Sequence, residues 1–439
     1  VVATVFEDTT TATGIYLTTV LLLVTGFFLN SYGEKSSLNL QQASILVFSS
    51  LFLLSLFGTV PYLYVFPSDE TSLEVFGNAF FSSAAGFTTG GISLFDEPEN
   101  LTQSFTFYRS YTQLVGGMSF IYLVITAFYP ESKLQSMRGF ISGRTLHMKE
   151  LFLTITVIFA VYIVIVAVLL YLFGSRNPID DFSPEHLIDN FSLAMSTLAT
   201  GGFTPTSTIL DDLLWQEHII LMGAMILGAL PFTFHYAFVR KKFLSPKLGK
   251  EVLTYFGILG GATILFILVS GLEPLQSAFY SVSASTTAGL QQESLAGLNG
   301  GAHTILIILM FIGGCGFSTA GGFKIFRLFH LQNCRSFFNK IKRQELSVQS
   351  KKELMSTLII LALFPTISAI TGAHLAAIED VPFQDAFFEA AGVITTGGLS
   401  AGVIDTETDT ATKIVLGFLM IFGRLEIIAI IYIFVPKLS

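Results

Sequence analysis

Long and short apolar stretches alternate along this chain, and the alternation is repeated four times. A helix that spans the hydrocarbon core of a bilayer needs ~20 predominantly apolar residues. We expect spanning helices at 15–29, 43–66, 107–128, 151–173, 218–239, 253–270, 304–329, 354–371 and 412–434. The apolar stretches that are too short to cross, and that we expect to enter and leave on one side, are 73–86, 185–198, 274–285 and 383–394.

This order predicts an all-α polytopic membrane protein. One leading N-terminal helix is followed by four pseudo-repeats of helix, pore loop and helix around a central pore. Irregular backbone at membrane depth is tolerated only where protein or a water-filled path satisfies its polar groups. The expected units are an N-terminal accessory helix in 1–40 and pore repeats in 41–150, 151–250, 251–350 and 351–439.

Each short stretch leads into the same phrase, which reads small–Thr–small–Gly. The last glycines of successive copies lie 111, 87 and 109 residues apart. A single copy would be ordinary loop chemistry, but four copies in the same context favour a functional repeat. The residues concerned are Thr88, Thr89, Gly90 and Gly91; Thr200, Gly201 and Gly202; Thr286, Thr287, Ala288 and Gly289; and Thr395, Thr396, Gly397 and Gly398.

These phrases suit the chemistry of a selectivity filter. A cation that sheds its water in a pore needs a cage of oxygen ligands, which backbone carbonyls can supply. Glycine adopts the required dihedral angles at low cost and leaves a narrow lumen open. One loop makes a quarter of a ring, so we interpret the four phrases as metal-binding segments of one filter that act through backbone carbonyls.

Composition and charge agree with a membrane protein. Of the 439 residues, 52% are hydrophobic and 12% charged, against ~25% charged in soluble domains. Counted by the implied sides, 19 of the 23 Lys and Arg lie on one side. The positive-inside rule makes that side cytoplasmic and places the four phrases at the outer face. The exceptions are Arg109, Arg176 and Lys413 on the outer side and Arg424 within a helix.

The outer loops are acidic, and two interpretations stay open. A negative mouth concentrates cations at a pore entrance, whereas charges such as Asp96 and Glu97 are equally suited to simple solvation. The two cysteines, Cys315 and Cys334, indicate neither a disulfide framework nor a metal cluster.

The stretch 313–322 interrupts an apolar helix. Each glycine costs ~1 kcal/mol against alanine in a helix interior, so this density predicts a broken helix just below the phrases. The break is either a movable barrier or a kink that allows close helix packing. Its glycines are Gly313, Gly314, Gly316, Gly321 and Gly322.

Arg424 lies about twelve residues into the last apolar stretch, near mid-membrane. Insertion scales assign Arg at that depth a cost of ~2.5–3.5 kcal/mol. Facing the pore, its charge would form an electrostatic barrier to cations. The alternative is a structural ion pair with Glu426 or another carboxylate.

Three further motifs carry a resemblance that covers nearly the whole chain. They are Phe107-Tyr108-Arg109 with Gly116-Gly117-Met118, Phe311-Ile312-Gly313-Gly314-Cys315 with 318–324, and Phe422-Gly423-Arg424-Leu425-Glu426. Together with the four phrases, they resemble the TrkH family of the Trk potassium-uptake system, in the wider Trk/Ktr/HKT superfamily. The resemblance implies that Gly91, Gly202, Gly289 and Gly398 are the filter glycines and that 313–322 is an intramembrane gating loop. Plant relatives with serine at the first of these positions prefer sodium, so four glycines imply potassium.

The resemblance also implies the setting and the partners. We expect a multi-pass protein of a prokaryotic cell (inner) membrane, a homodimer, and a cytosolic RCK-type nucleotide-binding regulator similar to TrkA. The basic stretches 240–250 and 324–352 indicate lipid headgroup contact or docking of that regulator. Potassium is the transported ion, and no nucleotide is expected on this chain and no nucleic acid as a partner.

The expected function is potassium uptake through a channel-like pore driven by the membrane potential. The chain lacks GxxxxGK[ST], HExxH, GxSxG and GxGxxG, so no enzymatic activity is expected. A sodium- or proton-coupled symporter would need a buried carboxylate, for which Glu426 is the sole candidate by sequence. A less selective sodium/potassium transporter also stays open. A membrane-embedded enzyme or sensor would need clustered His, Asp or Ser chemistry or a soluble domain.

Overall fold

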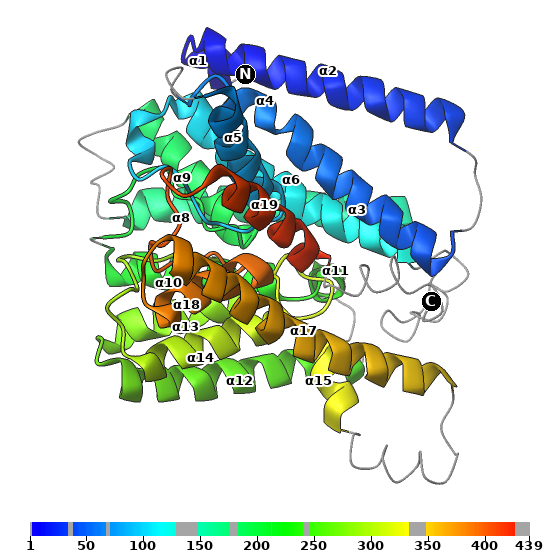
Figure 1. Ribbon diagram of the computed structural model, residues 1–439, viewed down its shortest axis with the longest axis vertical. Coiled ribbons are helices and arrows are strands. Elements are labelled where there is room, and N and C mark those ends of the chain that lie inside the picture. The colour runs from blue at the N-terminus through cyan, green and yellow to red at the C-terminus, as the bar shows by residue number, and fades with distance from the viewer. Residues whose placement is uncertain are drawn as a thin grey trace.

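The computed structural model describes residues 2–33, 38–66, 71–128, 148–174, 183–211, 213–239, 246–332 and 348–425. Within these ranges every regular element is a helix (Figure 1). Five helices there are long and apolar enough to cross a membrane, or six if a strongly bent pair is counted as one span. This confirms the expected all-α membrane fold.

The helices follow the expected order. The leading segment forms α1 (Val2–Val5) and α2 (Thr9–Tyr32), and the first repeat forms α3 (Leu40–Phe57), α4 (Thr59–Tyr62), α5 (Ser72–Phe87), η1 (Pro98–Asn100) and α6 (Gln103–Phe128). The second repeat forms α8 (Met148–Phe173), α9 (Pro184–Leu198), α10 (Trp215–Ala229) and α11 (Phe232–Val239). The third forms α12 (Pro246–Ser270), α13 (Pro274–Thr286), α14 (Gly300–Ile312) and α15 (Ile325–Gln332). The fourth forms α17 (Val348–Ile378), α18 (Phe383–Thr395) and α19 (Thr410–Arg424).

The four short helices α5, α9, α13 and α18 occupy the stretches expected to be re-entrant, and we call them the pore helices. Local sequence fixes their starts. Thr71 and Glu74 form a reciprocal capping box before α5, and Ser183 caps α9 ahead of Pro184. A proline also opens α13 at Pro274. Proline suits the first helical position, where its missing N–H costs nothing.

Helix packing closes the four repeats into a ring. In each repeat the helix before the pore helix packs against it: α3 on α5, α8 on α9, α12 on α13 and α17 on α18. The helix after each phrase packs against its own pore helix and also against the pore helix of the next repeat: α6 on α9, α10 on α13, α14 on α18, and α19 back on α5. The chain therefore surrounds one axis, while α2 lies along the outside of the bundle (Figure 1).

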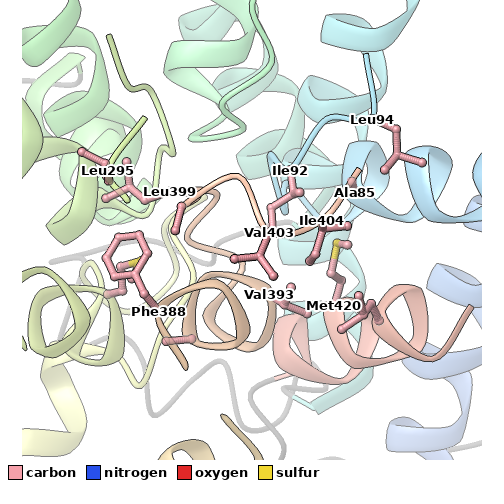
Figure 2. Close-up of a cluster of buried hydrophobic side chains, with 14 of the residues drawn as sticks. Ala85, Ile92, Leu94, Leu295, Phe388, Val393, Leu399, Val403, Ile404 and Met420 are labelled. Atoms are coloured by element: carbon pink, nitrogen blue, oxygen red, sulfur yellow. The ribbon is translucent and has the colours of Figure 1, made fainter. Parts of the chain in front are cut away.

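A buried apolar cluster joins the first, third and fourth repeats behind the phrases and includes Phe203 from the second. It combines pore-helix residues with residues that directly follow the phrases, so the phrases and the pore helices share one core. Figure 2 shows part of it: Ala85, Phe388, Val393 and Met420 from helices, and Ile92, Leu94, Leu295, Leu399, Val403 and Ile404 from the segments after the phrases. Because packed interiors transmit strain, a change in the pore helices is expected to reach the backbone of the phrases.

Two expected spans are broken. The stretch 304–329 breaks between α14 and α15, as the glycines predicted. The prediction of one continuous helix over 218–239 was wrong, because α10 and α11 meet at 103°. Proline lacks an N–H and clashes with the preceding turn, so Pro231 ends α10, and the freed Phe232 N–H donates to the carbonyl of Phe317, at 2.9 Å. Of the expected stretch 412–434, α19 covers the part up to Arg424, and 426–434 lies outside the described residues.

Candidate functional site

The four phrases meet around a single axis in chain order. A Cβ atom placed on the last glycine of any phrase would lie within about 3 Å of a carbonyl oxygen in the next phrase, and the fourth phrase closes onto the first. The ring therefore leaves no room for a side chain at these positions. The distances from the placed Cβ atom to the carbonyl oxygen are 2.5 Å for Gly91 and Gly201, 2.7 Å for Gly202 and Ala288, 3.0 Å for Gly289 and Gly397, and 3.1 Å for Gly398 and Gly90.

All four phrases share one backbone conformation. The last glycines have φ angles of 74°, 90°, 71° and 67°. The threonine two residues earlier is left-handed in every copy, with φ of 56° at Thr89, 54° at Thr200, 52° at Thr287 and 50° at Thr396. A β-branched residue at positive φ is strained, and such strain persists at functional sites where the surroundings enforce it.

The same hydrogen bonds end each pore helix. The N–H after the left-handed threonine donates to the carbonyl five residues earlier, at 2.7–2.9 Å, in Gly90, Gly201, Ala288 and Gly397. The threonine N–H donates three residues back, at 3.0–3.2 Å. This is a Schellman motif, in which glycine usually takes the left-handed position. A threonine in that position four times indicates that its side chain is needed.

Five of the seven threonine hydroxyls in the phrases fall into two groups, while Thr200 and Thr287 bond to other partners. Those of Thr88, Thr286 and Thr395 donate to the carbonyl one turn back, at 2.6–2.7 Å, and brace the helix end. The hydroxyl oxygens of Thr89 and Thr396 are buried and, among the described residues, have no hydrogen-bond partner. Two oxygens at matching positions are thus left available to a ligand.

Gln113 on α6 braces the second phrase. Its side-chain amide donates to the carbonyl of Gly201, at 2.7 Å, and its amide oxygen accepts from the N–H of Phe203, at 3.4 Å. The corresponding place behind the first and fourth phrases is held by methionine sulfur, from Met420 and Met310. The partner of Gln113 lies 88 residues away in the chain, so the sequence alone does not indicate this contact.

Glu389 on α18 braces the segment after the fourth phrase. It is fully buried. Its carboxylate accepts from the hydroxyl of Ser400, at 2.8 and 2.9 Å, and from the N–H of Ala401, at 2.7 Å. The Ser400 N–H donates to the side chain of Gln291 after the third phrase, at 2.8 Å, so two neighbouring phrases are tied together.

We expect Glu389→Ala to lower both thermal stability and ion discrimination. It removes the acceptor of the buried Ala401 N–H, and an unsatisfied buried group costs roughly 1–3 kcal/mol. Thermal unfolding in detergent and the rubidium-to-sodium flux ratio in liposomes are the measurements. Glu389→Gln keeps one acceptor oxygen and should show the smaller effect; equal values for all three proteins would contradict the brace.

Arg109, counted on the outer side from the sequence, lies near the start of α6 and is shielded from solvent. It is 1% exposed, donates to the hydroxyl of Ser93, at 2.6 Å, and lies over the rings of Phe95 and Phe203. Ser93 follows the first phrase and Phe203 the second. Lys413, also counted as an outer charge, is 1% exposed, and its ammonium donates to the carbonyl of Thr406, at 2.7 Å.

The two ends of the stretch 313–322, which we call the intramembrane loop, lie against each other. Gly313 and Gly322 both have positive φ, and a Cβ on Gly313 would lie 2.2 Å from the carbonyl oxygen of Gly321. The N–H groups of Phe323 and Lys324 donate back to the end of α14, at 2.7 and 2.9 Å. Gly314 and Gly316 are also close-packed, against Ala320 and Phe326.

The loop lies directly against the pore-helix end of the phrases. Gly322 N–H donates to the carbonyl of Thr395, at 3.1 Å, and Gly321 N–H to the hydroxyl of Thr287, at 2.5 Å. A Cβ on Gly321 would lie 2.0 Å from the carbonyl oxygen of Thr395. The loop therefore packs beneath the phrases with a backbone too close for any side chain.

The other side of the loop pairs with the break between α10 and α11. Cys315 N–H donates to the carbonyl of Ala229, at 3.0 Å, Thr319 N–H to that of Gly228, at 3.2 Å, and Phe232 N–H to that of Phe317, at 2.9 Å. The bend at Pro231 thus exposes polar backbone groups that the loop satisfies. The breaks in these two helices therefore satisfy each other's backbone hydrogen-bonding groups.

Arg424 contacts this loop. Its guanidinium is 2% exposed, donates to the carbonyl of Thr319, at 2.6 Å, and lies over the ring of Phe120. The residue proposed as a barrier and the loop proposed as a gate are therefore joined by a hydrogen bond. The alternative partner, Glu426, lies outside the described residues.

The expectation that Glu426 is the sole candidate for a buried carboxylate was wrong. Glu389 is fully buried, Asp189 is 4% exposed and Glu251 is 8% exposed. Glu389 and Asp189 belong to amphipathic pore helices. From the sequence their polar side chains are expected to face solvent, but closure of the ring buries them. Among the described residues, no cluster of three or more His, Cys, Asp or Glu side chains could hold a metal ion.

Known proteins resemble this chain over nearly its whole length. It is 24% identical to an uncharacterized cation transporter of Methanocaldococcus jannaschii over 93% of the chain and 85% of that protein. It is 25% identical to the Trk system potassium uptake protein TrkH of Escherichia coli, over 92% and 87%. The crystal structure of the potassium transporter TrkH from Vibrio parahaemolyticus superimposes with a TM-score of 0.74, at 19% identity and 98% coverage of both chains. The profile of the TrkH family, described as cation transport protein, matches residues 19–269 and 267–439, and the chain belongs to that family.

Proposed function

We propose that this chain takes up potassium ions through a channel-like pore driven by the membrane potential. The observation that carries the proposal is the closed ring of four phrases with one backbone conformation. A ring of carbonyls can replace the hydration shell of a cation. Two relatives, from Escherichia coli and Halomonas elongata, are named potassium uptake proteins.

The scaffold around the ring supports cation binding. All four pore helices end at the phrases, and a helix C-terminus carries roughly half a negative charge. The buried hydroxyls of Thr89 and Thr396 add oxygen ligands at the inner end of the ring. Four glycines at the last position favour potassium over sodium by the resemblance to plant relatives.

The intramembrane loop is the proposed gate. Arg424 holds the loop in place and also forms an electrostatic barrier. The loop lies beneath the ring, where it obstructs a path through the axis, and Arg424 bonds its backbone. Movement of the loop would open the path. A kink for helix packing alone would not require contact with two of the phrases.

A polarised membrane supplies the driving force. Moving one charge through 100 mV is worth ~2.3 kcal/mol, which suffices for accumulation without a second ion. The proposed orientation places the phrases outside and the basic stretches inside. A homodimer in a prokaryotic inner membrane and a cytosolic TrkA-like regulator on the basic face belong to the same proposal, as does the absence of enzymatic activity.

The experiment is tracer flux in proteoliposomes with an imposed diffusion potential. With no sodium or pH gradient, rubidium uptake should follow the potential and exceed sodium uptake. Uptake that stops unless a sodium or proton gradient is present would instead establish the coupled symporter. Liposomes without protein, and the same protein at zero potential, are the controls.

A further inference from the structure

Charged side chains outside the intramembrane loop hold it in place. No residue in 313–322 is charged, and the loop backbone must still satisfy its polar groups in a buried setting. Some of these backbone groups form hydrogen bonds with neighbouring phrases and with the break after α10. One remaining amide, that of Gly316, turns to the side chain of Glu251.

Glu251 lies in the first turns of α12 and is 8% exposed. Its Oε1 accepts from the N–H of Gly316, at 2.6 Å, which is short enough for a charge-assisted hydrogen bond. A Cβ placed on Gly316 would lie 2.6 Å from the ring of Phe326 and 3.4 Å from Oε1 of Glu251. Gly316 is therefore packed closely against both an aromatic ring and a carboxylate.

Lys324 balances the carboxylate at the far end of the loop. It is 3% exposed, its ammonium donates to the carbonyl of Ala320, and it interacts electrostatically with Glu251. The two opposite charges therefore bond to the loop backbone at Gly316 and at Ala320. A buried charge retained with a partner of this kind fixes one geometry, and losing one partner is costly.

We propose that Glu251 is a positioning residue that keeps the intramembrane loop beneath the filter. The proposal rests on the proposed function, because it specifies how the gate is held. Opening requires the Gly316 amide to leave the carboxylate, so weakening this bond favours the open arrangement. Arg424 acts on Thr319 from the end of α19 and Glu251 acts on Gly316 from α12, so the two restraints are separate.

The test compares Glu251→Leu, which removes the acceptor, with Glu251→Gln, which keeps an oxygen acceptor without the charge. A hydrogen bond to a charged group is worth enough that rubidium flux should rise roughly tenfold in the Leu variant and less in the Gln variant. The rubidium-to-sodium ratio should stay unchanged, because the phrases are not altered. Glu273→Gln, an exposed carboxylate at the start of the pore helix of the same repeat, should leave flux unchanged.

A second readout follows the loop itself. Cys315 is fully buried next to Gly316, so its reaction with a thiol reagent in detergent reports release of the loop. In a Cys334→Ser background, labelling of Cys315 should be faster in both Glu251 variants than in the parent, at equal elution volume in size exclusion. If the Leu variant does not fold, the near-isosteric Gln variant carries both measurements.

Failure of this inference differs from failure of the gate. Unchanged or reduced flux together with unchanged labelling in the folded Glu251 variants would overturn the role of Glu251. Reduced flux would mean that the carboxylate mainly offsets the positive field of Lys324 and Arg424. If Arg424→Ala also left flux unchanged, the proposed gate itself would fall.

Discussion

Replacing Gly91 with serine is expected to abolish most of the preference for potassium over sodium. The added Cβ would lie 2.5 Å from the carbonyl oxygen of Gly201 and 3.1 Å from Cα of Gly398, at a φ of 74°. Both neighbours are backbone atoms of adjacent phrases, so the ring must widen or distort. A loss of about 1.4 kcal/mol in differential binding is a tenfold change in selectivity, and we expect at least that in the rubidium-to-sodium permeability ratio.

The matched control is a glycine with open space around it. A Cβ on Gly223, in α10, meets no atom within 4 Å, so Gly223→Ser should retain the parent ratio and the parent amount of folded protein. A folded Gly91→Ser protein with the parent rubidium-to-sodium ratio would show that the ring does not discriminate between the ions. Gly289→Ser, whose Cβ would lie 2.7 Å from Cα of Gly398, repeats the test from a second repeat.

Replacing Arg424 with alanine is expected to raise potassium flux about tenfold, the equivalent of one hydrogen bond to a charged group. The guanidinium is 2% exposed and bonds the carbonyl of Thr319 in the intramembrane loop. Its removal takes away a positive charge from the path and one restraint on the loop. Initial rates of rubidium uptake at a fixed potential are the measurement.

Glutamine at position 424 separates the two contributions. It keeps N–H donors for the Thr319 carbonyl but carries no charge. Flux equal to that of Arg424→Ala would show that the charge forms the barrier, whereas flux near the parent value would show that the hydrogen bond matters more. A folded Arg424→Ala protein with flux at or below the parent level would end its role as a barrier.

The four phrases and their pore helices could be predicted from sequence because their causes are local. Each pore helix is short, apolar on one side, opened by a cap or a proline, and followed by a threonine two residues before a glycine. Repetition then supplied what one copy lacks, since four phrases in one context imply one shared structure. The loop at 313–322 was predictable for the same reason, through the density of its glycines.

The residues that brace these elements could not be found in this way. Gln113, Glu389 and Glu251 each act on a backbone group that the chain reaches only after the repeats have closed. In sequence each is an isolated polar residue within a helix, and no neighbouring residue identifies its partner. The bend at Pro231 was missed because the apolar composition of 218–239 continues through it, and because proline is tolerated in membrane helices when neighbours satisfy the freed backbone.

The sequence by itself determined the helices, the fourfold repeat and the glycines that leave the ring free of side chains, because hydropathy, helix ends and backbone dihedral angles depend on neighbouring residues. Only the tertiary structure decided which buried polar group satisfies which backbone atom. It paired the loop with the broken α10–α11 helix, with Glu251 and with Arg424. A buried amide or carbonyl must find a partner, and which partner it finds depends on how segments far apart in the chain pack around the axis.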